Sequence, residues 1–456
     1  MDLALMGRVL AMRGGLRRRD RWDRAELDAH RERRLRELRR FAVERSPFYR
    51  RLHAGLEDAP LEALPTVTKA ELAASFDEVV TDRGVRLADV EAHLRSMAGD
   101  ARFRGRYRVV STSGTTGVRG VFLSDAAEWA AVVGSYNRAQ EWAGVAASPT
   151  HRMRLAVVST TTAWHQSARV GASVANPLVR TLRVNATDPV ADSVARLNAF
   201  QPQSLIGYAS MHRLLAEEQL AGRLRISPTA ALSASEVLTD DTRRIVAQAW
   251  GRQPFNVYAA TEPAGIASEC EQHDGLHLYE DLVITEVVDE ANRRVSVGTF
   301  GAKILVTVLF SRTQPLIRYE MSDSVRLASR RCPCGRPYAL LDAIQGRQED
   351  ILQLPGRNGG LVAVHPLVFH DALDRVPAGE WQVVQEGDAL RLLVAGPGAG
   401  FDGAAVMAEI RTAIEAVGAV APNVTLSEVP AIPRTAAGKA PLVRADPGVT
   451  RPAPQR

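Results

Sequence analysis

A run of small hydroxyl residues and glycines at residues 111–117 is the strongest local signal for chemistry in this sequence. It reads Ser111-Thr112-Ser113-Gly114-Thr115-Thr116-Gly117 and follows a short apolar stretch. Such residues let the backbone wrap closely around an anion, and N–H groups and hydroxyls supply donors to phosphate oxygens. The run lacks the Gly-Lys-Ser/Thr ending of a Walker loop. Taken alone, a run of this composition is more often a plain loop than a phosphate site.

The choice of basic residues marks Lys439 as a candidate catalytic group. The chain has 57 basic residues, nearly all arginine, and its only lysines are Lys69, Lys303 and Lys439. An ammonium is a compact point charge and a guanidinium is a planar fork, so a retained lysine indicates a task that arginine does not perform. Lys439 ends the segment Pro433-Arg434-Thr435-Ala436-Ala437-Gly438-Lys439. A surface lysine is the ordinary alternative at such a position.

The three cysteines lie in two clusters that predict a metal site. Cys332-Pro333-Cys334 is a compact knuckle that presents two thiolates, and Cys270 lies upstream, shortly before His273 and His277. Three thiolates and one imidazole complete a tetrahedral structural zinc site, with no open position for a substrate. The odd number of cysteines argues against a disulfide framework. Incidental buried cysteines are the alternative.

Further motifs follow the hydroxyl-rich run in order: Tyr258-Ala259-Ala260-Thr261-Glu262, residues 316–323, residues 346–350 and the Lys439 segment. With these motifs the sequence resembles the adenylate-forming superfamily of acyl-CoA synthetases, luciferases and peptide-synthetase adenylation domains. Within it, the chain is most similar to the phenylacetate–CoA ligase and coenzyme F390 synthetase branch. The stretch Ser46-Pro47-Phe48-Tyr49-Arg50 and the cysteine clusters carry that part of the resemblance. The motifs extend from residue 46 to residue 443, nearly the whole chain.

The resemblance implies a role in nucleotide binding for each matching residue. It also favours His277 over His273 as the fourth zinc ligand, beside Cys270, Cys332 and Cys334, because the branch has a histidine seven residues after the first cysteine. A hard carboxylate oxygen such as that of Glu262 suits Mg²⁺. The implied nucleotide contacts are Ser111, Thr112, Ser113, Gly114, Thr115, Thr116 and Gly117 at the β- and γ-phosphates, Ser235 and Glu236 in a turn beside adenine, Tyr258 stacked on adenine, Thr261 at the α-phosphate, Glu262 on Mg²⁺, and Asp323 and Arg347 near the ribose.

Lys439 would reach the α-phosphate and the attacking carboxylate from a small C-terminal domain. Attack of a carboxylate on ATP brings two anions together, and a mobile ammonium with Mg²⁺ offsets that charge. The family implies that the small domain then rotates about Asp350 and opens a path for coenzyme A, whose thiol displaces AMP. The sequence thus predicts an ATP-dependent acid–thiol ligase. Transfer to an amine or a carrier-protein thiol is one alternative, and a non-catalytic nucleotide-binding homologue is another.

The acid that is activated is less well defined by the sequence. The branch favours aromatic acids, and Trp164 and His165 follow a predicted strand where they are candidates for the acid pocket. Packing residues are an equally good interpretation of this pair. The hydroxyl-rich run also departs from the family, which commonly has proline and often lysine after Gly117. Here Arg119 supplies the charge instead.

The charge and hydrophobicity of the chain argue against nucleic-acid and membrane partners. The net charge is +5, and arginines cluster at residues 17–24, but acidic residues are mixed among them and aromatic residues are sparse. We therefore expect a solvated helical face there. No apolar run approaches the roughly 18 residues of a membrane span. Without a recognisable signal peptide, a cytoplasmic location is expected, and nothing indicates the oligomeric state.

The elements that must position these residues predict an α/β protein. Apolar strand-like runs alternate with helical segments from about residue 105 to 310, which favours mixed, largely parallel sheets. We expect an adenylation domain over residues 1–345, a hinge at 346–350 and a small, mobile α+β domain over 351–456. The predicted helices are 22–55 with a stop at Ser46-Pro47, 124–142, 188–200, 209–221 and 239–250; the predicted strands include 108–110, 155–158, 204–206, 256–258, 304–310, 381–385, 390–395 and 424–426.

Overall fold

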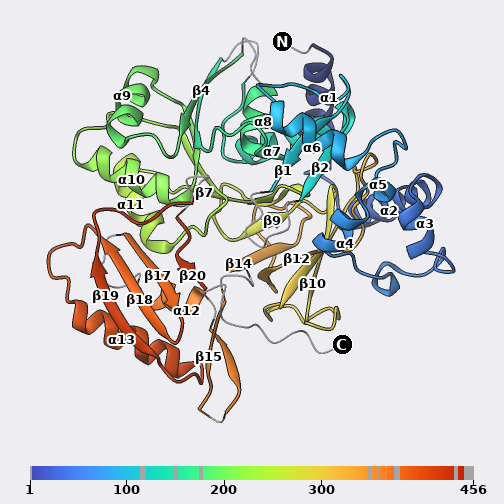
Figure 1. The fold of residues 1–456 in the computed structure, drawn as a ribbon. Coiled ribbons are helices and arrows are strands. Elements are labelled where there is room, and N and C mark those ends of the chain that lie inside the picture. Colours follow the sequence, from blue (N-terminus) through green and yellow to red (C-terminus); the bar gives the residue numbers. More distant parts are fainter. Residues whose placement is uncertain are drawn as a thin grey trace.

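The fold divides into two groups of elements with separate hydrophobic cores. The computed structural model describes residues 3–112, 120–147, 152–173, 178–347, 351–357, 359–364, 366–373, 380–435 and 440–445. Elements up to residue 347 form the larger group, coloured blue to orange in Figure 1. The orange and red elements from residue 351 onward lie below the green helices. The change between groups falls at the predicted hinge, of which residues 348–350 lie outside the described ranges.

A nine-stranded mixed sheet forms the centre of the larger group. Its order is β13-β14-β9-β8-β7-β6-β5-β3-β4, with parallel pairing from β7 to β4 and antiparallel pairing from β7 to β13. The predicted α/β class and mixed sheet are confirmed, with parallel pairing on one side only. The strands are β3 (Met153–Ser159), β4 (Val179–Asn185), β5 (Ser204–Gly207), β6 (Ala230–Ala234), β7 (Phe255–Ala260), β8 (Ala264–Glu269), β9 (Leu276–Leu278), β13 (Asp323–Leu327) and β14 (Leu340–Arg347).

Capping residues mark the start of α7 and both ends of α11. Asp125 caps the first turn of α7 through a capping box with Glu128, and Gly251 ends α11 in the left-handed conformation. The four helices predicted between residues 124 and 250 are confirmed within two residues at each end. They are α7 (Ala126–Trp142), α9 (Val190–Phe200), α10 (Ala209–Leu220) and α11 (Asp240–Trp250), with the shorter α8 (Gln166–Ser173) between β3 and β4.

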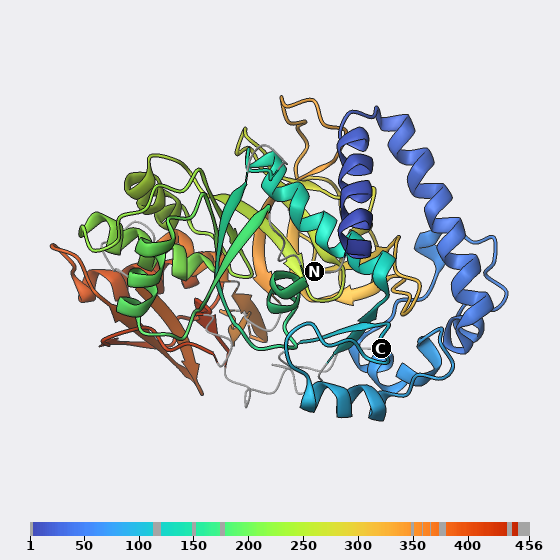
Figure 2. The same ribbon diagram turned by 90° about the horizontal axis from the view of Figure 1, so that it is seen from above.

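Helices also make up most of the first hundred residues. The helix predicted over residues 22–55 is confirmed but divided, because Pro47 lacks an N–H and Ser46 caps the helix that follows. In the described part of the chain, no helix is both long enough and apolar enough to cross a lipid bilayer. The helices are α1 (Leu3–Arg19), α2 (Arg24–Arg45), α3 (Pro47–Leu52), η1 (Leu61–Ala63), α4 (Lys69–Ala74), α5 (Phe76–Val79) and α6 (Leu87–Ser96). In Figure 2, α1 and α2, dark blue and blue, stand at one side of the sheet.

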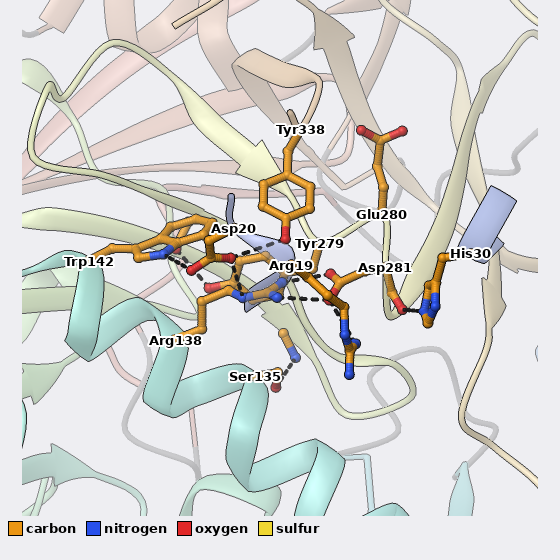
Figure 3. Close-up of polar contacts among 12 residues, drawn as sticks. Arg19, Asp20, His30, Ser135, Arg138, Trp142, Tyr279, Glu280, Asp281 and Tyr338 are labelled. Carbon is orange, nitrogen blue, oxygen red and sulfur yellow. Dashed lines mark hydrogen bonds and ion pairs between the residues drawn. The ribbon is translucent and has the colours of Figure 1, made fainter. Parts of the chain in front are cut away.

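A buried ion-pair network attaches α1 to the sheet (Figure 3). Arg138 of α7 donates from Nη1 and Nη2 to the two carboxylate oxygens of Asp281, at 2.7 and 2.8 Å. Arg19, at the end of α1, donates to the same carboxylate at 2.9 Å, and Asp20 accepts from Trp142 Nε1 at 2.9 Å. The predicted solvated face over residues 17–24 is therefore wrong for Arg19, because its charge is paired inside the protein.

Two smaller sheets complete the larger group. β1 (Arg108–Ser111) and β2 (Val121–Ser124) form an antiparallel hairpin around the hydroxyl-rich run. The second is a three-stranded antiparallel sheet, whose strands lie between β9 and β13 along the chain. It consists of β10 (Val283–Val288), β11 (Lys303–Val308) and β12 (Tyr319–Met321).

The elements after residue 351 form an α+β module with a core of its own. A four-stranded sheet has the order β19-β18-β17-β20. The predicted strands 381–385 and 390–395 are confirmed as the hairpin β17–β18, and the predicted strand 424–426 is confirmed as β19. Val406, Ile410 and Ile414 are buried on one face of α13, as their spacing predicts. The elements are β15 (Leu352–Pro355), β16 (Leu361–Val364), α12 (Pro366–Leu373), β17 (Glu380–Glu386), β18 (Ala389–Ala395), α13 (Gly403–Ala416), β19 (Asn423–Glu428) and β20 (Val443–Arg444).

Candidate functional site

The β1–β2 hairpin fixes both ends of the predicted phosphate loop. Ser111 ends β1, and the backbone N–H of Thr112 donates to the Gly120 carbonyl at 3.0 Å. The Gly120 N–H donates back to the Thr112 hydroxyl at 2.9 Å. The middle of the loop, including Ser113, Gly114, Thr115, Thr116 and Gly117, lies outside the described residues. The hairpin therefore presents the loop at a defined place, at the end of a two-stranded sheet.

Of the three lysines, Lys69 and Lys303 lie in described parts of the chain, and their surroundings differ. Lys303 forms an ion pair with Glu320 at 3.0 Å, which gives it a structural task. Lys69, in the first turn of α4, packs its stem against the base of the phosphate loop: a Cβ built on Gly120 would lie 3.2 Å from Lys69 Cε. Sequence reasoning assigned Lys69 no role, although the rarity of lysine was a signal. Lys439 lies outside the described residues.

Thr261 and Glu262 form the tip of the turn between β7 and β8, and neighbouring side chains hold both residues. The Gln166 amide donates to the Thr261 carbonyl at 3.1 Å, and its own oxygen accepts from the Tyr136 hydroxyl at 2.7 Å. The Tyr319 hydroxyl donates to Glu262 Oε1 at 3.3 Å. Gln166 and Tyr136 lie in no motif, and Tyr319 lies in the motif at residues 316–323 but was assigned no role, so sequence reasoning missed all three. A carboxylate held at a turn is a suitable donor for Mg²⁺.

Asp323 and Arg347, both implied at the ribose, lie directly opposite each other in the sheet. Their Cα atoms are partners in the β13–β14 register. The pairing places the backbones of these two residues side by side at one end of the β13–β14 ladder. Asp323 is buried; of Arg347 the structure describes only the backbone, at the end of β14. Tyr258 is buried in β7, which β9 and β8 separate from β14 in the sheet. Asp350, the predicted hinge residue, lies outside the described residues.

Ser235 and Glu236 follow β6 in a constrained turn. Ser235 has φ 70°, a left-handed conformation that non-glycine residues seldom adopt. The Glu236 carboxylate accepts from the Ser210 backbone N–H at 2.9 Å and from the Ala440 backbone N–H at 2.8 Å. Loss of solvation raises the pKa of Glu236, against the opposing effects of these N–H groups and of Arg434. Ala440 directly follows the predicted catalytic lysine in the sequence. The role predicted for this turn, beside adenine, does not include a contact with Ala440.

Trp164 and His165 lie between β3 and α8, close to the phosphate loop. The Trp164 carbonyl accepts from the Ser111 backbone N–H at 2.9 Å, and its half-buried ring packs against the apolar cluster beneath the β1–β2 hairpin. The two rings stack with centroids 6.5 Å apart. Trp164 therefore has a packing role, which is one of the two interpretations that the sequence left open. Both residues lie near the candidate site.

The four predicted zinc ligands come together between β8–β9 and the loop before β14. The ligand atoms of Cys270, His277, Cys332 and Cys334 all lie within 4.8 Å of one another. Cys270 Sγ and Cys332 Sγ are 3.7 Å apart, and Cys334 Sγ lies 3.3 Å from His277 Nε2. Two thiolates on one tetrahedral zinc ion, at about 2.3 Å each, lie about 3.8 Å apart, so the donor set fits the ion.

His273, the other candidate ligand, lies apart from this cluster, whereas Arg336 interacts with Cys334. His273 turns away: its Nδ1 lies 3.2 Å from Glu269 Oε2, and its ring packs on Phe255 with centroids 4.4 Å apart. Burial raises the pKa of the Cys334 thiol, but the Arg336 backbone and guanidinium outweigh that effect and lower it. If the cluster held a dication, three thiolates would leave one net negative charge, which Arg336 would offset.

Comparison with known proteins was made by sequence and by fold. No model of a protein family matches the chain. A phenylacetate–coenzyme A ligase of Thermus thermophilus is 28% identical over 366 residues, covering 78% of this chain and 76% of that ligase. A crystal structure of 2-hydroxyisobutyryl-CoA ligase in the postadenylation state, with 2-HIB-AMP, matches 95% of this chain and 92% of that one with a TM-score of 0.75 and 23% identity.

The same ligase has also been solved in an open conformation with 2-HIB-AMP and CoA. That form matches 94% of each chain with a TM-score of 0.62 and 24% identity. At nearly the same coverage, the fold matches the postadenylation form with the higher TM-score. The chain has the fold of the adenylate-forming ligases, and its sequence is similar to those of phenylacetate–coenzyme A ligases.

Proposed function

We propose that this protein uses ATP to activate a carboxylic acid as an acyl-AMP and then transfers the acyl group to coenzyme A. The observation that carries the proposal is that Glu262 and Lys439, to which we assign adenylation, stand in ordered motifs on a chain that is similar over most of its length to a phenylacetate–CoA ligase. Relatives named as CoA ligases, and a neighbour solved with acyl-AMP and CoA, support the same chemistry. An aryl or arylacetic acid is the first substrate class to test.

The described residues give each step a physical basis. The Thr261 hydroxyl would donate to the α-phosphate, with its backbone held by Gln166. Glu262, oriented by the Tyr319 hydroxyl, would hold Mg²⁺, which when bound neutralises phosphate charge. Asp323 and Arg347 would bind the ribose from opposed positions on β13 and β14. The Lys439 ammonium would offset the charge that develops as the carboxylate attacks phosphorus, and enclosure of the acyl-AMP would protect it from water.

The primary test is ATP–pyrophosphate exchange against a panel of aryl, arylacetic, short-chain and fatty acids. Parallel reactions contain coenzyme A and are analysed by mass spectrometry. Exchange with one acid class together with a thioester product is the expected result. Exchange without a thioester would redirect the search to an amine or a carrier-protein thiol as acceptor. Absence of both exchange and ATP binding would favour a non-catalytic homologue.

We further propose that Cys270, His277, Cys332 and Cys334 hold a structural zinc ion. The pure protein is expected to contain about one zinc per chain by elemental analysis. Cys334→Ser should lose the metal and about 2–4 kcal/mol of unfolding free energy, because the ion ties β8–β9 to the loop before β14. His273→Ala is the matched control and should retain zinc, since His273 lies apart from the four ligands. Equal zinc content in wild type and Cys334→Ser would contradict the assignment.

A further inference from the structure

A single carboxylate connects the large group of elements to the segment that carries Lys439. Glu236 Oε2 accepts from the backbone N–H of Ser210, in the first turn of α10, at 2.9 Å. Its other oxygen accepts from the backbone N–H of Ala440 at 2.8 Å. Tyr208, the N-cap residue of α10, makes no capping hydrogen bond with its own side chain. The Glu236 carboxylate instead accepts from one of the free N–H groups of the first turn. Glu236 is therefore held on the large group whether or not Ala440 is present.

Ala440 belongs to the small domain. It is buried together with Ile432, Leu393 and Ala395 in an apolar cluster against the small sheet. The next residue, Pro441, accepts from the Gln382 amide of β17 at 2.7 Å. A hydrogen bond from Ala440 to Glu236 is thus a contact between the two domains, and it must break if the small domain rotates away.

The amide that binds Glu236 is the peptide link between Lys439 and Ala440. Adjacent Cα atoms lie 3.8 Å apart across a trans peptide, so a catalytic role of Lys439 would depend on where this amide is held. The other flank of the same segment is held at the same place: Arg434 Nη1 donates to the Ser210 hydroxyl at 3.0 Å. Ser210 and Glu236 therefore hold both sides of the segment that carries Lys439.

We infer that Glu236 is a positioning residue, which with Ser210 latches the Lys439 segment in place for adenylation and releases it for the thiol step. The inference rests on the proposed function and deepens it. It differs from the adenine-side role that family resemblance implies for Glu236. The greater likeness of the fold to a postadenylation form than to an open form agrees with a latch that is closed here.

The latch predicts a split between the two half-reactions. Glu236→Gln keeps the size of the side chain, but its amide group offers one acceptor for two N–H donors. The kcat of ATP–pyrophosphate exchange should fall about tenfold, with the KM for ATP within about twofold of wild type, because one charge-assisted hydrogen bond is lost. Thioester formation from supplied acyl-AMP and coenzyme A should not fall, because the latch is open in that step. A role at adenine would instead raise the KM for ATP.

A structural readout tests the contact without knowledge of the acid. Hydrogen–deuterium exchange of the peptide that contains Ala440 should speed up in Glu236→Gln and more in Glu236→Ala, because the amide loses its acceptor. Glu217→Gln is the control: Glu217 is on α10 and pairs with Arg213 at 3.0 Å, not with the Lys439 segment. It should change neither the amide exchange nor the ratio of the half-reactions.

The outcomes separate this inference from the proposed function. Slower ATP–pyrophosphate exchange with unchanged thioester formation and faster amide exchange would support the latch. Unchanged kcat in Glu236→Gln, a rise in KM alone, or unchanged amide exchange would overturn it, while a functioning wild-type enzyme would leave the proposed function intact. A wild type that performs no exchange with any acid would overturn the proposed function, and the amide-exchange experiment alone would then decide the contact.

Discussion

Replacement of Lys439 by alanine is expected to lower ATP–pyrophosphate exchange by about 10²–10³-fold, the range found when one preorganised electrostatic group is removed from a transition state. Two anions meet when the carboxylate attacks the α-phosphate, and in the proposed mechanism the Lys439 ammonium offsets their charge. Thioester formation from supplied acyl-AMP should change little, because no phosphorus is attacked in that step. The measurement compares both half-reactions under single-turnover conditions.

Two further variants sharpen the test of Lys439. Lys439→Arg keeps the charge but replaces a compact ammonium by a planar fork, so it should restore only part of the rate. Lys303→Arg is the control, since Lys303 forms an ion pair with Glu320 that arginine can maintain. Adenylation at the wild-type rate in Lys439→Ala would show that the assigned role is wrong. Equal losses in both half-reactions would indicate damage to the fold instead of a lost charge.

Local sequence signals sufficed for much of the fold. Alternating apolar strands and capped helices predicted the connections from α7 to β7, and the i, i+4 spacing of Val406, Ile410 and Ile414 predicted the buried face of α13. These features depend on neighbours within a few residues, which periodicity and capping report directly. The cysteine clusters were also predictable, because metal ligands are few in kind and their spacing is restricted.

Contacts between distant segments were not predictable in the same way. Asp281 is 262 residues from Arg19, and Ala440 is 204 residues from Glu236. Arginines 17 to 24 look like a solvated face in the sequence because their partners are supplied by other elements. Gln166 and Tyr136, which help to hold the Thr261–Glu262 turn, lie in no motif, and the motif that contains Tyr319 gave no sign of its contact with Glu262. Such residues are found only when the strands and helices have been placed in space.

Replacement of Asp281 by alanine is expected to destabilise the protein by about 3–5 kcal/mol, because it leaves the Arg138 guanidinium buried without its main partner. The side chains of Arg138 and Asp281 are 1% and 0% exposed, so water cannot replace the lost carboxylate. Arg19 would lose the same partner, which should loosen α1 from the sheet. The measurement is the denaturant dependence of unfolding, with hydrogen exchange in α1 as the local readout.

The matched control is Asp89→Ala, which removes a carboxylate whose ion pair with Arg104 is about half exposed. Its effect should stay below about 1 kcal/mol. The double change Arg138→Met with Asp281→Leu should recover part of the loss, since it removes both charges and leaves neither unpaired. Equal unfolding midpoints for Asp281→Ala and Asp89→Ala would contradict the importance of the network.

The pH dependence of stability in a second variant at this position, Asp281→Asn, gives an independent check. Burial raises the pKa of the Asp281 carboxyl, but the charges and hydrogen bonds of Arg138 and Arg19 more than offset burial and hold it at about 2. The ordinary aspartate pKa is about 4, so the folded state binds the proton less well than the unfolded state. The stabilisation by Asp281 is therefore fully present above about pH 4 and is lost as the pH falls toward about 2. The difference in unfolding free energy between wild type and Asp281→Asn should shrink over that interval, and a difference that stays constant would show that the carboxylate is not ionised by its arginine partners.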